Sequence, residues 1–268
     1  MLTQAQLDQY QRDGFVFPVR VMDEAAAAEC RTRIEDFERA SGEPLRGELR
    51  HKSHLLFGWI ADLVRHECIL DAVQDIHGAN LLCWTSNFFI KEAGDPAFVS
   101  WHQDSTYWGL DRPDVVTAWV ALTASDEGNG AMGFIPGSHT QDQIPHRDTF
   151  DSHNLLTRGQ EVMVEVDASS QVQVCLQPGE MSLHHVRLVH GSPPNRSADR
   201  RIGLAIRYIP TSVRQIAGDD SATLVRGIDE LRHFEHEPRP TGDLQPDFVA
   251  LHKRIAQRNA AILYRGTA

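Results

Sequence analysis

The sequence predicts a mainly β protein whose core is a sandwich or barrel with helices at both ends of the chain. Short runs rich in β-branched and aromatic residues fill the middle, about residues 79–210, and Gly, Pro and Asn separate them. Helical spacing of apolar residues is confined to the two flanks. No G-x-G-x-x-G or P-loop motif occurs, which argues against a nucleotide-binding α/β fold.

The N-terminal flank is expected to hold three helices. Thr3 and Gln6 form a capping-box pattern that begins the first helix. A short strand and then an Ala-rich helix at 24–40 follow, since Ala has the highest helix propensity. Residues 55–76 predict one further helix, because Leu, Ile and Val recur there at helical spacing.

Seven short strands are expected in the core, at a spacing typical of sandwiches and barrels. They are the runs 81–91, 114–122, 130–136, 162–166, 172–176, 179–186 and 201–209. A polar loop at 211–227 is expected to be partly ordered and to cover a pocket, with Arg214 and Arg226 as its contacts. A closing helix is expected at 246–263. Because no repeat or low-complexity linker interrupts the chain, 1–268 is expected to be a single domain.

Composition places the chain among ordinary globular proteins. It has 268 residues, 41% apolar and 24% charged, with a net charge of -11. An acidic balance argues against nucleic-acid binding, which needs Lys and Arg to neutralise phosphates. The first residues lack the basic and apolar regions of a secretory signal, and no apolar run approaches the roughly 20 residues of a membrane helix. A cytoplasmic protein is therefore expected.

The stretch "SWHQDSTYW" contains a candidate metal-binding pair, His102 and Asp104. Side chains two apart in a strand point to the same face, so these two project together. They form half of the two-His-one-carboxylate set of non-haem Fe(II) oxygenases. With 14 histidines in the chain, the triplet alone favours a surface His beside a carboxylate. His190, which ends a later strand-like run, and Arg201, eleven residues further on, favour the metal site.

These motifs resemble the phytanoyl-CoA dioxygenase family of Fe(II)/2-oxoglutarate-dependent oxygenases. The similarity covers about residues 5–212, and it rests on H-Q-D at 102–104, "GAMGFIPGSH" at 130–139, H-G-S at 190–192 and the Arg that follows. The resemblance implies a double-stranded β-helix core (jelly roll, cupin-like). It also implies Fe(II), 2-oxoglutarate and O2 as the participants in catalysis.

The resemblance also assigns roles to residues. The iron ligands are His102, Asp104 and His190, and the 2-oxoglutarate-binding residues are Arg201, Ser192, Trp119 and Asn87, where Asn87 differs in identity from the family pattern. Arg201 is the clamp for the distal carboxylate. Arg200 is the alternative clamp, although strand alternation puts it on the opposite face.

The type of reaction depends on Asp104. Family relatives that halogenate carry Ala or Gly at this position, which frees a site on the metal for chloride. Retention of the carboxylate favours hydroxylation of an aliphatic C–H bond, with release of succinate and CO2.

Five further residues are candidates for substrate binding. They are Lys52 and His54 ahead of the third helix, Tyr107 and Trp108 after the metal strand, and Arg207, six residues after Arg201. Each has a structural alternative: Lys52 and His54 suit a solvated loop, and the aromatic pair suits the core. His184 shares a strand face with His190 and is a candidate for packing behind it.

The expected substrate is a small polar or anionic molecule, such as an amino acid, an aminoalkyl phosphonate or a natural-product precursor. The oligomeric state is expected to be a monomer or homodimer, without nucleic-acid or membrane partners. An acyl-CoA hydroxylase, a metal-dependent cupin-type hydrolase or isomerase, and a non-catalytic binding protein are the alternatives. Dependence on O2 and 2-oxoglutarate separates the oxygenases from the others.

Overall fold

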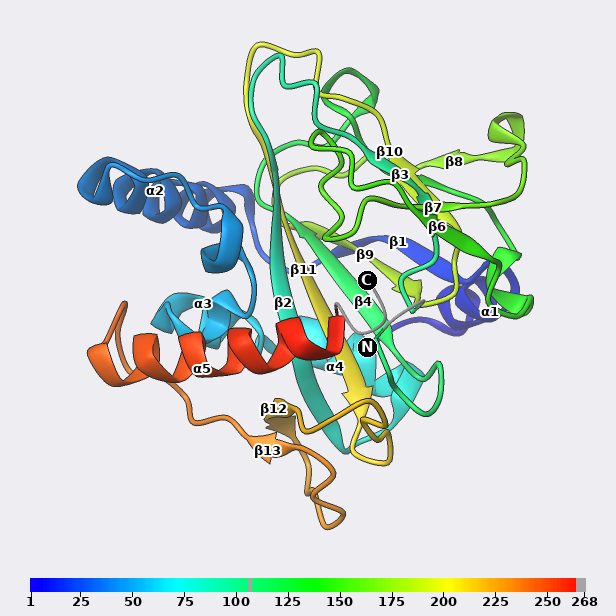
Figure 1. Ribbon diagram of the computed structural model, residues 1–268. Helices are drawn as coiled ribbons and strands as arrows, with labels where there is room; N and C mark the ends of the chain where they lie inside the picture. Colours follow the sequence, from blue (N-terminus) through cyan, green and yellow to red (C-terminus); the bar gives the residue numbers. More distant parts are fainter. Residues whose placement is uncertain (106–107, 264–268) are drawn as a thin grey trace.

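The computed structural model describes residues 1–105 and 108–263, and two facing β-sheets form its centre (Figure 1). Within these residues the larger sheet has the order β1 (Phe15–Arg20), β9 (Glu180–His185), β4 (Val116–Ala121), β11 (Arg201–Pro210), β2 (Leu81–Lys91), β12 (Ser221–Arg226) and β13 (Glu235–His236). The smaller has the order β3 (Val99–His102), β10 (His190–Ser192), β5 (Gly133–Phe134) and β8 (Val172–Gln173). A separate hairpin joins β6 (His146–Asp148) and β7 (Gln160–Val162). This is the expected jelly roll.

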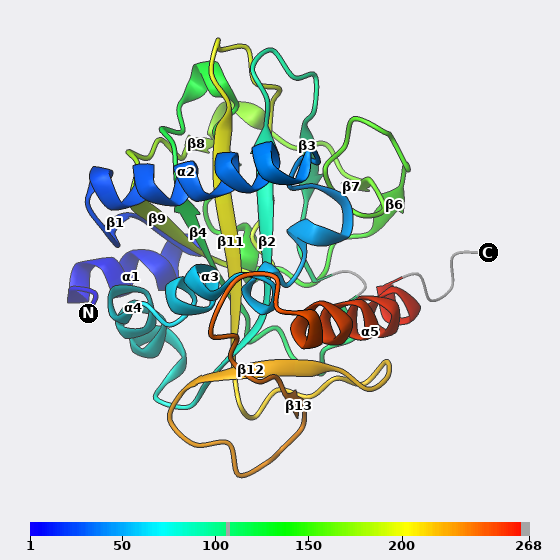
Figure 2. The ribbon, with the colours of Figure 1, turned by 90° about the vertical axis from the view of Figure 1, so that its left-hand side faces the viewer.

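Helices cover one face of the larger sheet, as Figure 2 shows for α2 and α3. The helices are α1 (Gln4–Asp13), α2 (Glu24–Ser41), α3 (Gly58–Leu63), α4 (Glu67–His77) and α5 (Pro246–Leu263). Short 3₁₀ turns lie at η1 (Gly47–Arg50), η2 (Ser53–Leu55), η3 (Glu127–Asn129), η4 (Ser138–Thr140) and η5 (Ala168–Ser170). The capping box predicted at Thr3 and Gln6 begins α1. None of the helices in the described ranges is long and apolar enough to cross a membrane.

Side chains of β11 alternate between the apolar core under the helices and the space between the two sheets. Ile202, Leu204, Ile206 and Tyr208 pack against the helices in the main apolar cluster. The intervening residues point between the two sheets, where Ala205 joins a second apolar cluster with Trp119 and Phe134. Arg201 and Arg207 share this inner face and are buried. The sheet therefore carries two guanidinium groups into the interior of the protein.

The helical segment expected at 55–76 is confirmed only in part, because it is divided into η2, α3 and α4 with a break after Val64. The helical spacing persists across the break, since Ile60, Leu63, Ile69 and Val73 are all buried. The side chain of His66 accepts a hydrogen bond from the backbone N–H of Cys68 and begins α4. A polar cap inside an apolar pattern thus starts a new helix.

The loop expected at 211–227 is also partly wrong. Its second half is β12, which pairs antiparallel with β2 and extends the larger sheet. Arg214 is exposed and pairs with Asp111, and Arg226 pairs with Asp71 of α4, so neither points into the cavity described below. The expected strand at 162–166 ends after Val162, because the residues that follow leave the hairpin.

Candidate active site

Two paired strands bring His102 and His190 together. His102 ends β3, His190 begins β10, and the two residues are direct partners in this antiparallel pair. Their ring centroids lie 4.1 Å apart. Asp104 follows two residues after His102, and its backbone N–H donates to the carbonyl of Val186 at 3.0 Å. One potential ligand atom from each of the three residues lies within 4.8 Å of the others, and all three residues are buried.

Backbone carbonyls determine which nitrogen of each histidine is available to a metal. The Nδ1 of His102 lies 2.9 Å from the carbonyl of Ser100, and the Nδ1 of His190 lies 2.9 Å from that of Leu188. Because a carbonyl only accepts, Nδ1 carries the proton in both rings, and each Nε2 presents a lone pair. Burial lowers the pKa of His190 to about 3, which keeps its ring neutral. Both rings are therefore preset as metal ligands.

Asp104 is buried beside a cation. Burial acts to raise the pKa of its carboxyl group, but Arg207 and the neighbouring histidines outweigh this and hold the pKa well below its usual value. The Nη2 of Arg207 lies 3.3 Å from Oδ1 of Asp104. The Nε2 of His102 lies 3.5 Å from the same oxygen. An ionised carboxylate thus completes the set of two imidazoles and one carboxylate.

Gln103, between two of these residues, anchors the segment. Its side-chain amide donates to the carbonyl of Arg187 at 2.8 Å, and its side-chain oxygen accepts from the backbone N–H of Ile144 at 2.7 Å. Its backbone N–H donates to Nε2 of His146 at 2.9 Å. Sequence reasoning missed this role, because the partners lie about 40 and 84 residues away in the chain.

Arg201, Ser192 and Trp119 line a small cavity together with the histidines and Asp104. The guanidinium of Arg201 lies 5.2 Å from the centre of the Trp119 ring and donates to the carbonyl of Gly130. Its Nε has no hydrogen-bond partner among the described residues, and burial lowers its pKa to about 10. A buried cation without a carboxylate partner suits the binding of an anion.

Lys91 lies behind this cavity and was missed by sequence reasoning. Its backbone pairs with Arg201 on the neighbouring strand, and its amine donates to the hydroxyl of Ser192 at 2.7 Å. Burial, with the nearby charge of Arg201, lowers the pKa of Lys91 to about 6. Arg200, the alternative clamp, faces away as alternation predicts, and it pairs with Glu38 and Glu92.

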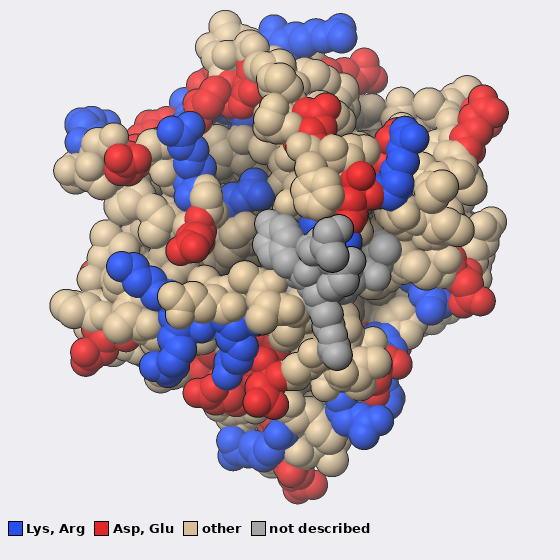
Figure 3. All heavy atoms as spheres, in the orientation of Figure 1, with Lys and Arg blue, Asp and Glu red and all other residues tan. Residues whose placement is uncertain are grey.

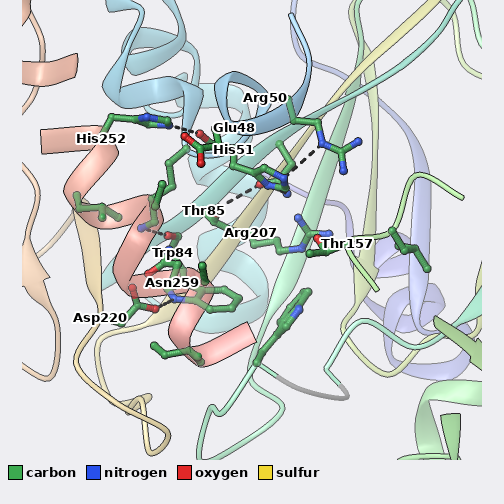
Figure 4. Close-up of a pocket in the computed structure, with 18 of the residues that line it drawn as sticks. Glu48, Arg50, His51, Trp84, Thr85, Thr157, Arg207, Asp220, His252 and Asn259 are labelled. Atoms are coloured by element: carbon green, nitrogen blue, oxygen red, sulfur yellow. Dashed lines mark hydrogen bonds between the residues drawn. The ribbon is translucent and has the colours of Figure 1, made fainter. Parts of the chain in front are cut away.

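A larger cavity of about 510 Å³ adjoins the metal-binding residues. Phe89, Asp104 and Arg207 line both cavities. Residues of β2, η1 and α5 form much of the wall (Figure 4). The junction at Asp104 and Arg207 therefore opens toward a space large enough for an organic substrate.

A family model described as phytanoyl-CoA dioxygenase matches residues 10–203. The chain belongs to this family. A probable alpha-ketoglutarate-dependent hypophosphite dioxygenase from Stutzerimonas stutzeri is 32% identical over 68% of this chain and 64% of its own length. Ectoine dioxygenase from Streptomyces avermitilis is 30% identical over 52% of each chain. The chain thus spans less than two thirds of the length of these two curated relatives.

Solved structures support the fold of this phytanoyl-CoA dioxygenase family member. The non-heme monooxygenase ThoJ, in its apo form, aligns with a TM-score of 0.86 at 34% identity, covering 96% of this chain and 97% of ThoJ. CytC3 aligns with a TM-score of 0.68 at 24% identity, covering 91% and 96%, which bears on the fold alone. The expected family and the jelly-roll fold are confirmed.

Several residues that the sequence proposed for this family member have protein partners. Lys52 and His54 are buried, and both bond to Glu237, at 2.6 and 3.1 Å. These contacts explain the burial of both side chains without a bound ligand. Asn87 lies in the larger cavity rather than beside Arg201, because it pairs with Ala205 further along β11; its amide lies 2.8 Å from Nδ1 of His51.

The remaining proposed residues lie near the metal site or outside the described ranges. Trp108 lines the larger cavity and packs under the guanidinium of Arg207, 4.8 Å from its ring centre. Tyr107 lies outside the described residues. His184 is buried, and its ring centroid lies 4.9 Å from that of His190, where it packs behind this candidate ligand.

Proposed function

We propose that this chain is an Fe(II)- and 2-oxoglutarate-dependent dioxygenase that hydroxylates an aliphatic C–H bond of a small molecule, releasing succinate and CO2. The observation that carries the proposal is a buried His-Asp-His set beside a buried arginine with an unpartnered Nε. A metal-dependent hydrolase would need the metal ligands but not this arginine. The His-Asp-His set together with the buried arginine therefore indicates a 2-oxoglutarate-dependent oxygenase more specifically than either feature alone.

The donor set fits Fe(II). His102 and His190 would each contribute Nε2, and Asp104 would contribute one carboxylate oxygen, with Arg207 beside the carboxylate. When bound, iron with 2-oxoglutarate supplies the oxidising chemistry for C–H hydroxylation. Because all three ligands come from this chain, the protein alone sets the orientation of the ligand face. We infer that Asp104 occupies the position that a halide would need, which favours hydroxylation over halogenation.

The cosubstrate pocket fits a dicarboxylate. Arg201 would pair with the distal carboxylate of 2-oxoglutarate, and Ser192, oriented by Lys91, would donate its hydroxyl hydrogen to the same group. Trp119 lies against the guanidinium and limits the directions in which it can turn. Gly203 makes this contact possible, since a Cβ at this position would overlap the Trp119 ring.

The partner is a small molecule rather than nucleic acid or a membrane, and the chain acts in the cytoplasm as a monomer or homodimer. Acidic and basic side chains are interspersed on the face seen in Figure 3, without one broad basic field. The names of two relatives refer to hypophosphite and ectoine, and that of a third, from Streptomyces griseoviridis, to L-proline. These names support a small polar substrate, with Arg207 as the residue that meets an anionic group.

The test is cosubstrate chelation under anaerobic conditions. Protein loaded with Fe(II) is titrated with 2-oxoglutarate, and the visible metal-to-ligand charge-transfer band is recorded. The wild type is expected to develop the band. Arg201→Met is expected to weaken 2-oxoglutarate binding by about 10- to 100-fold, because a charge-assisted hydrogen-bonded pair is lost.

Arg200→Met is the matched control, since it removes the adjacent guanidinium on the other face of the strand. It should leave the band intact. Asp104→Ala should weaken iron binding itself. Absence of the band in folded, iron-loaded wild type would mean that 2-oxoglutarate is not the cosubstrate, and the metal site would then be assigned to hydrolysis or structure.

A further inference from the structure

The larger cavity contains a buried carboxylate for which the described residues supply no cationic partner. Asp220 lines this cavity, and only 5% of its surface is exposed. Its Oδ2 accepts from Nε1 of Trp84 at 2.7 Å, and its Oδ1 accepts from the backbone N–H of Ser221 at 2.8 Å. Across the described part of the chain, no Lys, Arg or His side chain forms an ion pair with Asp220. A buried charge without a counter-charge is costly, so this position suits a cationic ligand.

Lys52, whose amine lies beside the residue next to Asp220, is already engaged by another carboxylate. Lys52 donates to the main-chain carbonyl of Ser221, next to Asp220. The same amine forms its ion pair with Glu237 at 2.6 Å, and both side chains are nearly inaccessible to solvent. Lys52 therefore neutralises Glu237 and leaves the charge of Asp220 unbalanced.

Two tryptophans form an aromatic wall beside this carboxylate. Trp84, which donates to Asp220, packs against Trp108 with ring centroids 5.0 Å apart, and both line the cavity. Aromatic faces attract cations, most strongly when water is excluded. Because the guanidinium of Arg207 already lies over the Trp108 ring, Trp84 is the indole beside Asp220 that suits an ammonium group.

An unpartnered acceptor on α5 faces the same cavity. The Oδ1 of Asn259 is buried and has no hydrogen-bond partner among the described residues. In Figure 4, Asn259 and Asp220 lie on one side of the cavity, and Arg207 lies on the other, toward the metal-binding residues. Asn259 is therefore available to accept a hydrogen bond from an N–H donor in this cavity.

We propose that the substrate carries an ammonium group, held at Asp220 and Asn259 beside Trp84, and a body that extends past Arg207 toward the candidate metal site. Leu155, Ile255 and Ile262 supply apolar wall for that body. The cavity, at about 510 Å³, lies in the range that accommodates drug-sized ligands. The cavity therefore has room for a substrate larger than proline. This assignment rests on the proposed function, since it places the substrate beside the metal residues.

Binding of matched probes tests the proposal. Hexylamine, hexanol and hexanoate share one chain and differ in the charge of the head group. Each is titrated into the protein loaded with Fe(II) and 2-oxoglutarate without oxygen, and tryptophan fluorescence and calorimetry report binding. The amine is expected to bind about 10- to 100-fold more tightly than the alcohol, and hexanoate serves as the probe of opposite charge, which Arg207 can attract. Equal binding of amine and alcohol would overturn the proposal. This comparison uses the wild-type protein alone.

Asp220→Asn is expected to reduce the preference for the amine to within about threefold of the alcohol, because it removes the charge and keeps an oxygen for Trp84. Asp219→Asn is the matched control, since Asp219 is exposed next to Asp220 and should leave the preference unchanged. If Asp220→Asn does not fold, Asn259→Ala serves instead, because the side-chain oxygen of Asn259 has no hydrogen-bond partner among the described residues. Retention of the amine preference in the folded variant would contradict the assignment.

The two proposals fail in distinguishable ways. A 2-oxoglutarate band without an amine preference would reject the ammonium site and leave the dioxygenase assignment standing. An amine preference without the band would reject the dioxygenase assignment and leave a binding site for amines.

Discussion

Replacing Lys52 by Met is expected to destabilise the folded chain by about 3–5 kcal/mol, because it leaves one half of a buried ion pair behind. The amine of Lys52 donates to Glu237 at 2.6 Å, to the carbonyl of Trp84 at 2.7 Å and to that of Ser221 at 2.8 Å. The exposed fractions of the two charged side chains are 4% and 1%. Methionine fills a similar volume without satisfying any of these acceptors, so the loss is chiefly that of charge and hydrogen bonds.

The assay is equilibrium unfolding in urea, which gives the free energy of unfolding by linear extrapolation. The double variant Lys52→Met/Glu237→Gln should recover more than half of the loss, because Gln can still bond to the neighbouring hydroxyls without a charge. Lys253→Met, at an exposed position on α5, should change stability by less than about 0.5 kcal/mol. A Lys52→Met protein of unchanged stability that bound 2-oxoglutarate or substrate poorly would refute this reasoning and assign Lys52 to ligand binding.

Three further outcomes are expected. Glu237 has a pKa below its usual value, because Lys52 and His54 outweigh the effect of burial, so its contribution to stability is present above about pH 4.5 and is lost as pH falls further. Unfolding measured at pH 7 and pH 3 should show the gap between wild type and Lys52→Met shrinking in acid; a constant gap would argue against this pair. The pKa of Lys91 is lowered to about 6, so its amine is largely neutral at pH 7.5, and a dicarboxylate bound nearby restores the charge. Calorimetry of 2-oxoglutarate binding in buffers of different ionisation enthalpy should detect proton uptake that Lys91→Met abolishes, and uptake that persists in the variant would assign the proton elsewhere. Gly203→Ala should weaken 2-oxoglutarate binding by displacing Trp119, and an unchanged charge-transfer titration would show that the ring can shift without consequence.

The sequence alone predicted the features that depend on local spacing. The two-residue spacing predicted that His102 and Asp104 project together, which holds although Asp104 lies in the turn after β3, and alternation separated Arg201 from Arg200. The capping box of the first helix is likewise a property of a few adjacent residues. The third helical segment was predicted as one helix because apolar spacing continues across the break that His66 caps.

The tertiary structure decided which distant side chains share a buried space. The ion pair of Lys52 and Glu237 joins residues 185 positions apart, and Trp84 and Asp220 lie 136 apart. No local pattern distinguishes these four residues from solvated ones, because their burial depends on β12 pairing with β2 and on the packing of α5. Local spacing thus predicted the candidate metal ligands, whereas long-range strand pairing decided which charges are balanced within the protein and which remain for a ligand.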